Sequence, residues 1–188
     1  VALIDREIQH VKNGGTGHII AKMNSLLDSR MVDKLYEASQ AGVKIELIVR
    51  GICVLIPGIP GVSDNITVRS LVGRFLEHSR VFWFNNGGRE ELYIGSADWM
   101  PRNLNDRVEL MIPVKDTDCM HRIKDMVLKE LADNQKAHIM QSNGTWVKMI
   151  ASENKVCAQE YFQKLAEQRS EQEKMTLKQK FEPYVPVK

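Results

Sequence analysis

Two hydrophobic periodicities alternate along the first fifty residues, and this alternation constrains the fold more than any other feature of the sequence. Residues 2–12 and 28–40 carry apolar side chains at the spacing of an amphipathic helix. Residues 18–23 form a short apolar run, and apolar side chains alternate with others over residues 43–49, as is typical of strands. Alternating helices and strands predict an α/β fold, with helices packed on the faces of a sheet.

The remaining pattern extends this sheet. Strands are predicted at residues 66–68, 80–84, 91–95 and 107–113, a turn of helix at 71–75, and a helix at 116–133. Beyond these, residues 137–149 predict a hairpin that turns at residues 142–144, and residues 155–180 a polar helix. We therefore expect a mixed sheet flanked by helices, with residues 1–140 as the main unit and residues 141–188 as a peripheral hairpin and charged helical tail.

Composition narrows the class of protein. The chain has 188 residues, of which 43% are hydrophobic and 27% charged, and this suits one globular domain. A net charge of +2 is too small to indicate nucleic-acid binding, and no apolar run approaches the roughly 20 residues that span a bilayer. Three scattered cysteines lack metal-ligand spacing, which predicts no metal site and a reducing compartment such as the cytoplasm. Because the chain begins with Val1 rather than methionine, we expect a fragment of a longer protein.

The candidate site begins where the predicted strand 80–84 begins. Residues two apart in a strand share a face, so the imidazole of His78 and the guanidinium of Arg80 are expected to meet the same phosphoryl group. The turn at residues 95–96 would direct backbone N–H groups at an anion. Glu109 is the candidate carboxylate that fixes the tautomer of His78, which would then transfer a proton.

Simpler interpretations stay open for each of these side chains. His78 would otherwise cap a short helix before a buried strand, and Glu109 would pair with Arg102 or Arg107 on the surface. Arg50 follows the predicted strand 43–49, at the strand end where ligands bind in α/β sheets, but a surface salt bridge is the alternative.

The order of these motifs resembles one half of the phospholipase D superfamily signature. The matching residues are His78 with Arg80, then Gly95, Ser96 and Asp98, then Glu109. Arginine stands where that signature has lysine, and aspartate stands where it has asparagine. The resemblance implies a phospholipase D-like half, and these departures argue against phospholipase or nuclease activity.

A narrower resemblance covers roughly residues 1–140. Six blocks in order resemble the C-terminal domain of bacterial polyphosphate kinases, namely residues 24–26, 35–43, 48–53, 57–61, 74–80 and 96–104. Many separate blocks in one order make a chance match improbable.

This resemblance implies reversible transfer of the terminal phosphate of ATP to polyphosphate, through a phosphohistidine in the preceding domain. Under it, His78 contacts ATP and acts as the acid or base, and Arg50 binds the phosphate of the nucleotide. Magnesium would accompany ATP, with its ligands in the preceding domain. The implied partners are ATP, ADP, polyphosphate, the preceding domains and further copies of the chain in a homo-oligomer. The implied location is cytoplasmic or peripheral to the membrane, and this chain alone would be inactive.

Two other functions remain open at this level. One is a phospholipase D-like phosphodiesterase or nuclease, in which a dimer would bring two copies of His78 together. The other is a noncatalytic module that binds polyphosphate.

Overall fold

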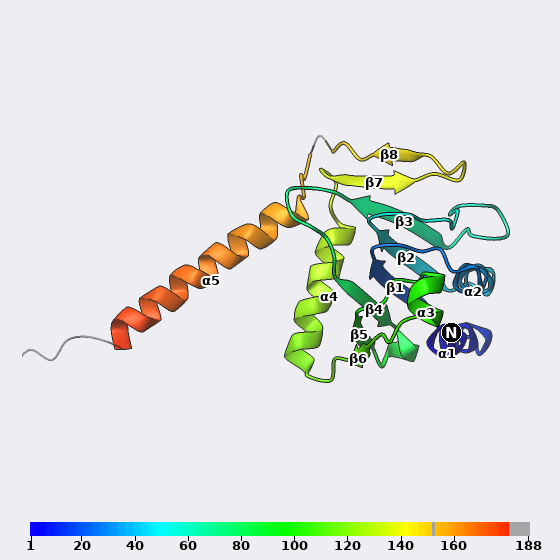
Figure 1. Ribbon diagram of the computed structural model, residues 1–188, viewed down its shortest axis with the longest axis horizontal. Coiled ribbons are helices and arrows are strands. Elements are labelled where there is room, and N and C mark those ends of the chain that lie inside the picture. Colours follow the sequence, from blue (N-terminus) through cyan, green and yellow to red (C-terminus); the bar gives the residue numbers. More distant parts are fainter. Residues whose placement is uncertain (152, 181–188) are drawn as a thin grey trace, which may run out of the picture.

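The structure, a computed structural model, describes residues 1–151 and 153–180, the last six of these by their backbone alone. Its strands form a single eight-stranded sheet with the order β6-β5-β4-β1-β2-β3-β7-β8 (Figure 1). The strands are β1 (His18–Met23), β2 (Lys44–Val49), β3 (Ile66–Leu71), β4 (Arg80–Phe84), β5 (Glu91–Gly95), β6 (Met111–Pro113), β7 (Ala137–Met140) and β8 (Trp146–Lys148). β1, β2 and β3 are parallel, and the other pairs are antiparallel. The predicted mixed sheet is confirmed.

Helices cover both faces of this sheet (Figure 1). Helices α1 (Ala2–Lys12) and α2 (Ser29–Gln40) pack on one face, and α4 (Thr117–Leu131) packs on the other. A short helix α3 (Pro101–Asn105) and a 3-10 turn η1 (Asn86–Gly88) lie in the connections. The long helix α5 (Ala158–Lys180) extends away from the sheet. No helix of the described residues is both long and apolar enough to cross a membrane.

Local sequence explains why α2 begins and ends where it does. The carboxylate of Asp28 accepts a hydrogen bond from the backbone N–H of Met31 at 3.1 Å, which satisfies one of the free donors of the first turn. Gly42 follows the helix with φ of 95°, a conformation that favours glycine and stops the helix. Between these ends, Leu35 is fully buried, and shortening such a side chain to alanine typically costs about 2–5 kcal/mol.

Alternation along β1 divides the interior into two layers. Ile19 and Ala21 pack with α1 and α2, whereas Ile20 packs in the layer beneath α4. Lys22 shares the face of Ile20 and is only 2% exposed, so a charged side chain is buried where the pattern calls for an apolar one.

Several predicted elements are confirmed, with changes at their ends. The hairpin forms as β7 and β8, the polar helix forms from residue 158, and the strand expected at residues 66–68 extends to Leu71. Residue 152 and residues 181–188 of the predicted tail lie outside the described residues.

Two predictions were wrong. Residues 72–79 form an irregular segment rather than a turn of helix, and the side chain of Gln159 bonds both the backbone N–H and the carbonyl of Phe75 there. The strand expected at residues 107–113 contains only Met111–Pro113. Leu110, the residue before it, donates its backbone N–H to the side-chain hydroxyl of Ser96 and not to a backbone carbonyl of the neighbouring strand, because the strand begins only after this residue.

Candidate functional site

The candidate site lies at the sheet edge where the parallel strands β1 and β2 end. Met23 stands opposite Val49, and Lys22 stands opposite Val81 near the start of the antiparallel strand β4. Arg80 in turn stands opposite Gly95 at the end of β5. Four chain segments therefore reach one edge, and they carry Asn24, Arg50, His78 to Arg80, and Ser96 to Asp98. This is the edge at which open α/β sheets bind ligands.

Asp98 holds the guanidinium of Arg80 in a bidentate ion pair. Nε of Arg80 donates to Oδ1 of Asp98 at 3.1 Å, and Nη2 donates to Oδ2 at 3.0 Å. The backbone N–H of Asn24 donates to the same Oδ1 at 2.7 Å. The side chains of Arg80 and Asp98 are only 12% and 6% exposed, so this pair is a fixed part of the site rather than a loose surface contact.

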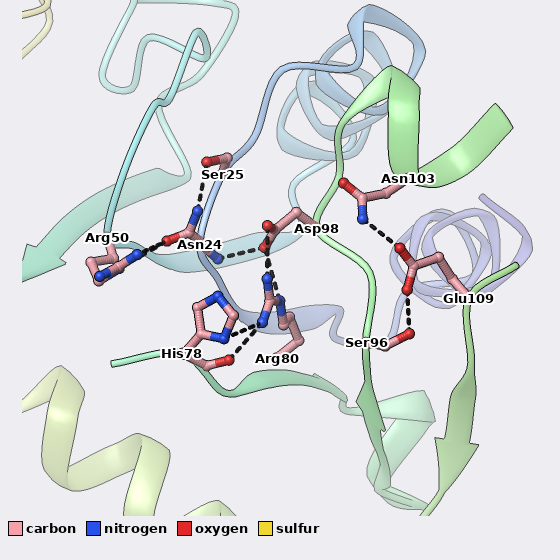
Figure 2. Close-up of polar contacts among 9 residues, drawn as sticks. All are labelled: Asn24, Ser25, Arg50, His78, Arg80, Ser96, Asp98, Asn103 and Glu109. Carbon is pink, nitrogen blue, oxygen red and sulfur yellow. Dashed lines mark hydrogen bonds and ion pairs between the residues drawn. The ribbon is translucent and has the colours of Figure 1, made fainter. Parts of the chain in front are cut away.

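Arg80 also sets the tautomer of His78 (Figure 2). Its Nη1 lies 2.9 Å from Nδ1 of His78 and donates to the His78 carbonyl oxygen at 2.8 Å. A guanidinium nitrogen can only donate, so Nδ1 must accept and the proton of the neutral ring resides on Nε2. The prediction that His78 and Arg80 lie together is confirmed. However, four of the five Arg80 N–H groups are directed at Asp98 and His78, and this leaves little of the guanidinium for a phosphate.

Arg50 is oriented by Asn24 from the neighbouring strand. Nε of Arg50 donates to Oδ1 of Asn24 at 2.8 Å, and Nη2 donates to the same oxygen. The Asn24 amide donates in turn to the hydroxyl of Ser25 at 3.1 Å. Within the described residues, no hydrogen bond of Nη1 is found and no carboxylate pairs with Arg50, so the surface salt bridge is absent there. A half-buried cation held by an amide is suited to meet an anion.

Gly51 explains how tightly the chain turns beside Arg50. A Cβ at this position would lie 3.0 Å from the backbone oxygen of Asn24 and 3.2 Å from the hydroxyl of Ser25. The backbone N–H of Gly51 uses that closeness to donate to the Asn24 carbonyl at 2.7 Å. The ends of β1 and β2 are thereby bonded to each other next to the candidate site.

The structure corrects the expectation that Glu109 orients the imidazole of His78. Figure 2 shows the Glu109 carboxylate between Ser96 and Asn103, on a different side of the site from His78. The hydroxyl of Ser96 and the amide of Asn103 both donate to it. These two hydrogen bonds hold the pKa of the Glu109 carboxyl below its usual value, so the group is ionised at neutral pH. The pairing with Arg102 or Arg107 is also absent from the hydrogen bonds and ion pairs of the described residues.

The turn at residues 95–96 was predicted to direct backbone N–H groups at an anion, but the N–H of Ser96 is not free to do so. That N–H donates to the carbonyl of Leu110 at 3.0 Å, so it is already used. Among the side chains that the structure describes, no three histidines, cysteines, aspartates or glutamates are grouped so that they could hold a metal ion.

Two contributors to the site were not predicted in their actual roles. Asn24 directly follows a buried strand, and that placement alone marks it as a candidate at the ligand-binding edge. Asp98 was noted as a departure from a known motif, but its pairing with Arg80 depends on the alignment of β4 with β5. No local pattern in the sequence specifies that alignment.

Comparison with known proteins gives these side chains a context. Residues 1–159 match the family described as polyphosphate kinase C-terminal domain 2. A polyphosphate kinase of Synechocystis is 57% identical over 147 residues, which are 78% of this chain and 20% of that protein. The crystal structure of the polyphosphate kinase from Porphyromonas gingivalis matches with a TM-score of 0.85 and 45% identity, over 91% of this chain and 26% of that one.

A more distant likeness concerns the fold alone. Nuc from Salmonella typhimurium, a phospholipase D family member, matches with a TM-score of 0.52 and 12% identity, over 72% of this chain and 89% of that one. The phospholipase D-like fold predicted from the sequence is thus confirmed. The chain spans about a fifth of the length of the Synechocystis protein and about a quarter of the Porphyromonas chain. With its family matched over most of its length, the chain belongs to the polyphosphate kinase C-terminal domain 2 family.

Proposed function

We propose that this chain is one half of the active site of a polyphosphate kinase and that it acts within a longer protein, here called the parent protein. The reaction is reversible transfer of the terminal phosphate of ATP to polyphosphate through a phosphohistidine in a preceding domain. The observation that carries the proposal is the hydrogen bond from Arg80 to Nδ1 of His78 at the ligand-binding edge. It leaves Nε2 of His78 as the ring nitrogen available to a substrate.

The contacts of Arg50, His78 and Arg80 support the role proposed for each. Phosphoryl transfer depends mainly on positioning and on cations near the phosphate oxygens, and Arg50 provides a cation that Asn24 holds in place. We assign proton transfer at Nε2 to His78, and to Arg80 the role of holding that ring rather than binding phosphate directly. Glu109 is given no contact with the reacting groups, because its carboxylate is engaged by Ser96 and Asn103.

The remaining partners belong to the parent protein. We propose that residues 1–140 form the catalytic unit of this fragment and that residues 141–188 are peripheral to it. Magnesium enters with ATP in this proposal, and its ligands lie in the preceding domains. The proposal further includes a homo-oligomer, a cytoplasmic or membrane-peripheral location, and no role for nucleic acid.

Substitution of Arg50 and His78 in the parent protein tests this proposal. Arg50→Ala and His78→Ala should each lower the rate of polyphosphate synthesis from ATP by about 100-fold or more, the usual cost of losing a transition-state donor or a general acid. The matched controls are Arg122→Ala and His121→Ala, since both side chains are exposed on α4 and, in the described part of the chain, neither forms a hydrogen bond or ion pair with Arg50 or His78. Near-normal synthesis in either site variant would exclude the role given to that residue.

A further inference from the structure

A buried charged cluster lies directly behind the candidate site and has no part in the roles given above. Nζ of Lys22 donates to Oε2 of Glu77 at 2.6 Å and to Oε1 of Glu130 on α4. The Lys22 and Glu130 side chains are each 2% exposed, and that of Glu77 is 15% exposed. Three elements of the fold, namely β1, α4 and the segment before β4, therefore converge on one ammonium group.

Glu77 is the anchor of an otherwise exposed segment. In residues 72–79, which connect β3 to β4, every residue except Glu77 is exposed. Burial raises the pKa of the Glu77 carboxyl, but the hydrogen bonds from Lys22 and Gln159 outweigh burial and leave the pKa below its ordinary value. The ionised Glu77 thus ties this segment to Lys22, and the next residue in the chain is His78.

The first turn of α5 holds the same segment from the other side. The amide of Gln159 donates to Oε1 of Glu77 at 2.7 Å and to the Phe75 carbonyl at 2.9 Å, and its oxygen accepts the Phe75 N–H at 3.0 Å. A Cβ on Gly73 would lie 2.4 Å from that oxygen, so glycine allows the close approach. The helix is itself fixed at its start, where Asp133 accepts the backbone N–H of Ala158 at 2.8 Å.

Stability alone does not account for this cluster. Buried ion pairs are often no more stabilising than apolar side chains of the same size, because both charges lose their hydration. Here Oε2 of Glu130 is buried without a hydrogen-bond partner among the described residues. Burial, only partly opposed by Lys22, raises the pKa of the Glu130 carboxyl to about 7. An apolar residue in place of Lys22 would avoid these costs, but it would leave the Glu77 carboxylate without its cation.

We propose that Lys22 is a positioning residue for phosphoryl transfer, which holds His78 in place through Glu77 while Glu130 and Gln159 fix the other sides of the cluster. The proposal rests on the function proposed above, in which His78 contacts the reacting phosphate. Two restraints then act on one ring. Arg80 fixes its tautomer from β4, and Lys22 fixes the backbone that precedes it.

The test compares Lys22→Met with Lys124→Met in the parent protein. Methionine keeps most of the length of lysine but removes the charge. Lys124 is the control, because it lies on α4, the helix that also carries Glu130, and its Nζ pairs at 2.6 Å with Glu90, which lies beyond the end of β4 opposite to His78. Lys22→Met should lower kcat about 10- to 100-fold with KM for ATP within about threefold, since the loss is in placement of a reacting group rather than in ATP binding. Lys124→Met should leave both constants within about twofold.

A double-mutant cycle with His78→Ala separates positioning from a general structural effect. If Lys22 acts through His78, Lys22→Met should not further lower the residual phosphate transfer of the His78→Ala protein. Equal loss in both backgrounds, or an unchanged kcat in Lys22→Met alone, overturns the proposal. Should Lys22→Met fail to fold by circular dichroism, Glu77→Gln takes its place, with the same cycle and the same outcomes.

The His78→Ala and Lys22→Met proteins together separate the role of Lys22 from the role of His78. Near-normal synthesis by His78→Ala would remove the proposed role of His78, and with it the role of Lys22. An inactive His78→Ala protein together with an unaffected Lys22→Met protein would overturn the positioning role alone.

Discussion

Replacing Asp98 by asparagine should destabilise the chain more than the loss of any exposed charge. The Asp98 carboxylate receives three donors, namely the backbone N–H of Asn24 and two N–H groups of Arg80. Asparagine keeps one oxygen acceptor but puts an NH2 group where the second oxygen was. That group would face a donor of Arg80, and the guanidinium would lose its counter-charge in a place where only 12% of its side chain is exposed.

The magnitude follows from what is lost. Removing one partner of a buried ion pair typically costs about 3–5 kcal/mol, because the other charge stays buried. Since the retained oxygen still accepts part of the network, we expect the loss of roughly one charge-assisted hydrogen bond, or about 2–3 kcal/mol. At a urea dependence of about 2 kcal/mol per molar, the unfolding midpoint should fall by about 1–1.5 M.

Urea unfolding of the 188-residue chain, followed by circular dichroism, measures this shift. The control is Glu37→Gln, because Glu37 forms an exposed pair with Lys34 on α2 and its side chain is 52% exposed. Such a pair is worth less than about 1 kcal/mol, so its midpoint should move little. If the urea midpoint of Asp98→Asn lies as close to that of the unsubstituted chain as the midpoint of Glu37→Gln does, the view that Asp98 holds Arg80 in place is refuted.

Two further substitutions test the contacts of Glu109 and Glu46. Glu109→Gln in the parent protein should leave polyphosphate synthesis within about twofold of normal, because Glu109 does not contact His78, whereas a loss as large as that of His78→Ala would contradict the observed geometry. Glu46→Gln should lower the free energy of unfolding of the chain above about pH 4.5 but not near pH 2. The hydrogen bond from His18, followed by that from Lys44, outweighs burial and lowers the pKa of the Glu46 carboxyl from 4.5 to about 2, so the stabilisation is present above pH 4.5 and lost as pH falls toward 2. Urea midpoints at pH 6, 4 and 2.5 measure this effect, and a difference that does not change with pH would count against it.

Elements set by local patterns were predictable from the sequence. Helix α2 carries its own start at Asp28 and its own stop at Gly42, and β1 and β2 carry continuous apolar patterns. The contact between His78 and Arg80 was also predictable, because two residues of spacing in an extended chain put both on one face. These features depend on residues that are close together in the sequence.

Features that depend on distant partners were not predictable in this way. The segment 72–79 is shaped by Gln159, which lies more than eighty residues further along the chain. Glu109 turns to Ser96 and Asn103 because β5 pairs with β6, and that pairing brings Ser96 beside Leu110. The short helix α3 had a local signal in Pro101 at its first position, but its five residues are too few for a hydrophobic period to appear.

We propose that this chain is half of a phosphotransfer site and that the phosphorylated histidine lies elsewhere in the parent protein. The most direct measurement is to incubate the parent protein with γ-labelled ATP and to map any acid-labile phosphohistidine by peptide sequencing. The account predicts label on a histidine outside these 188 residues, and loss of that label in His78→Ala and Arg50→Ala. Label on His78 itself, or cleavage of a phosphodiester without any labelled histidine, would contradict it.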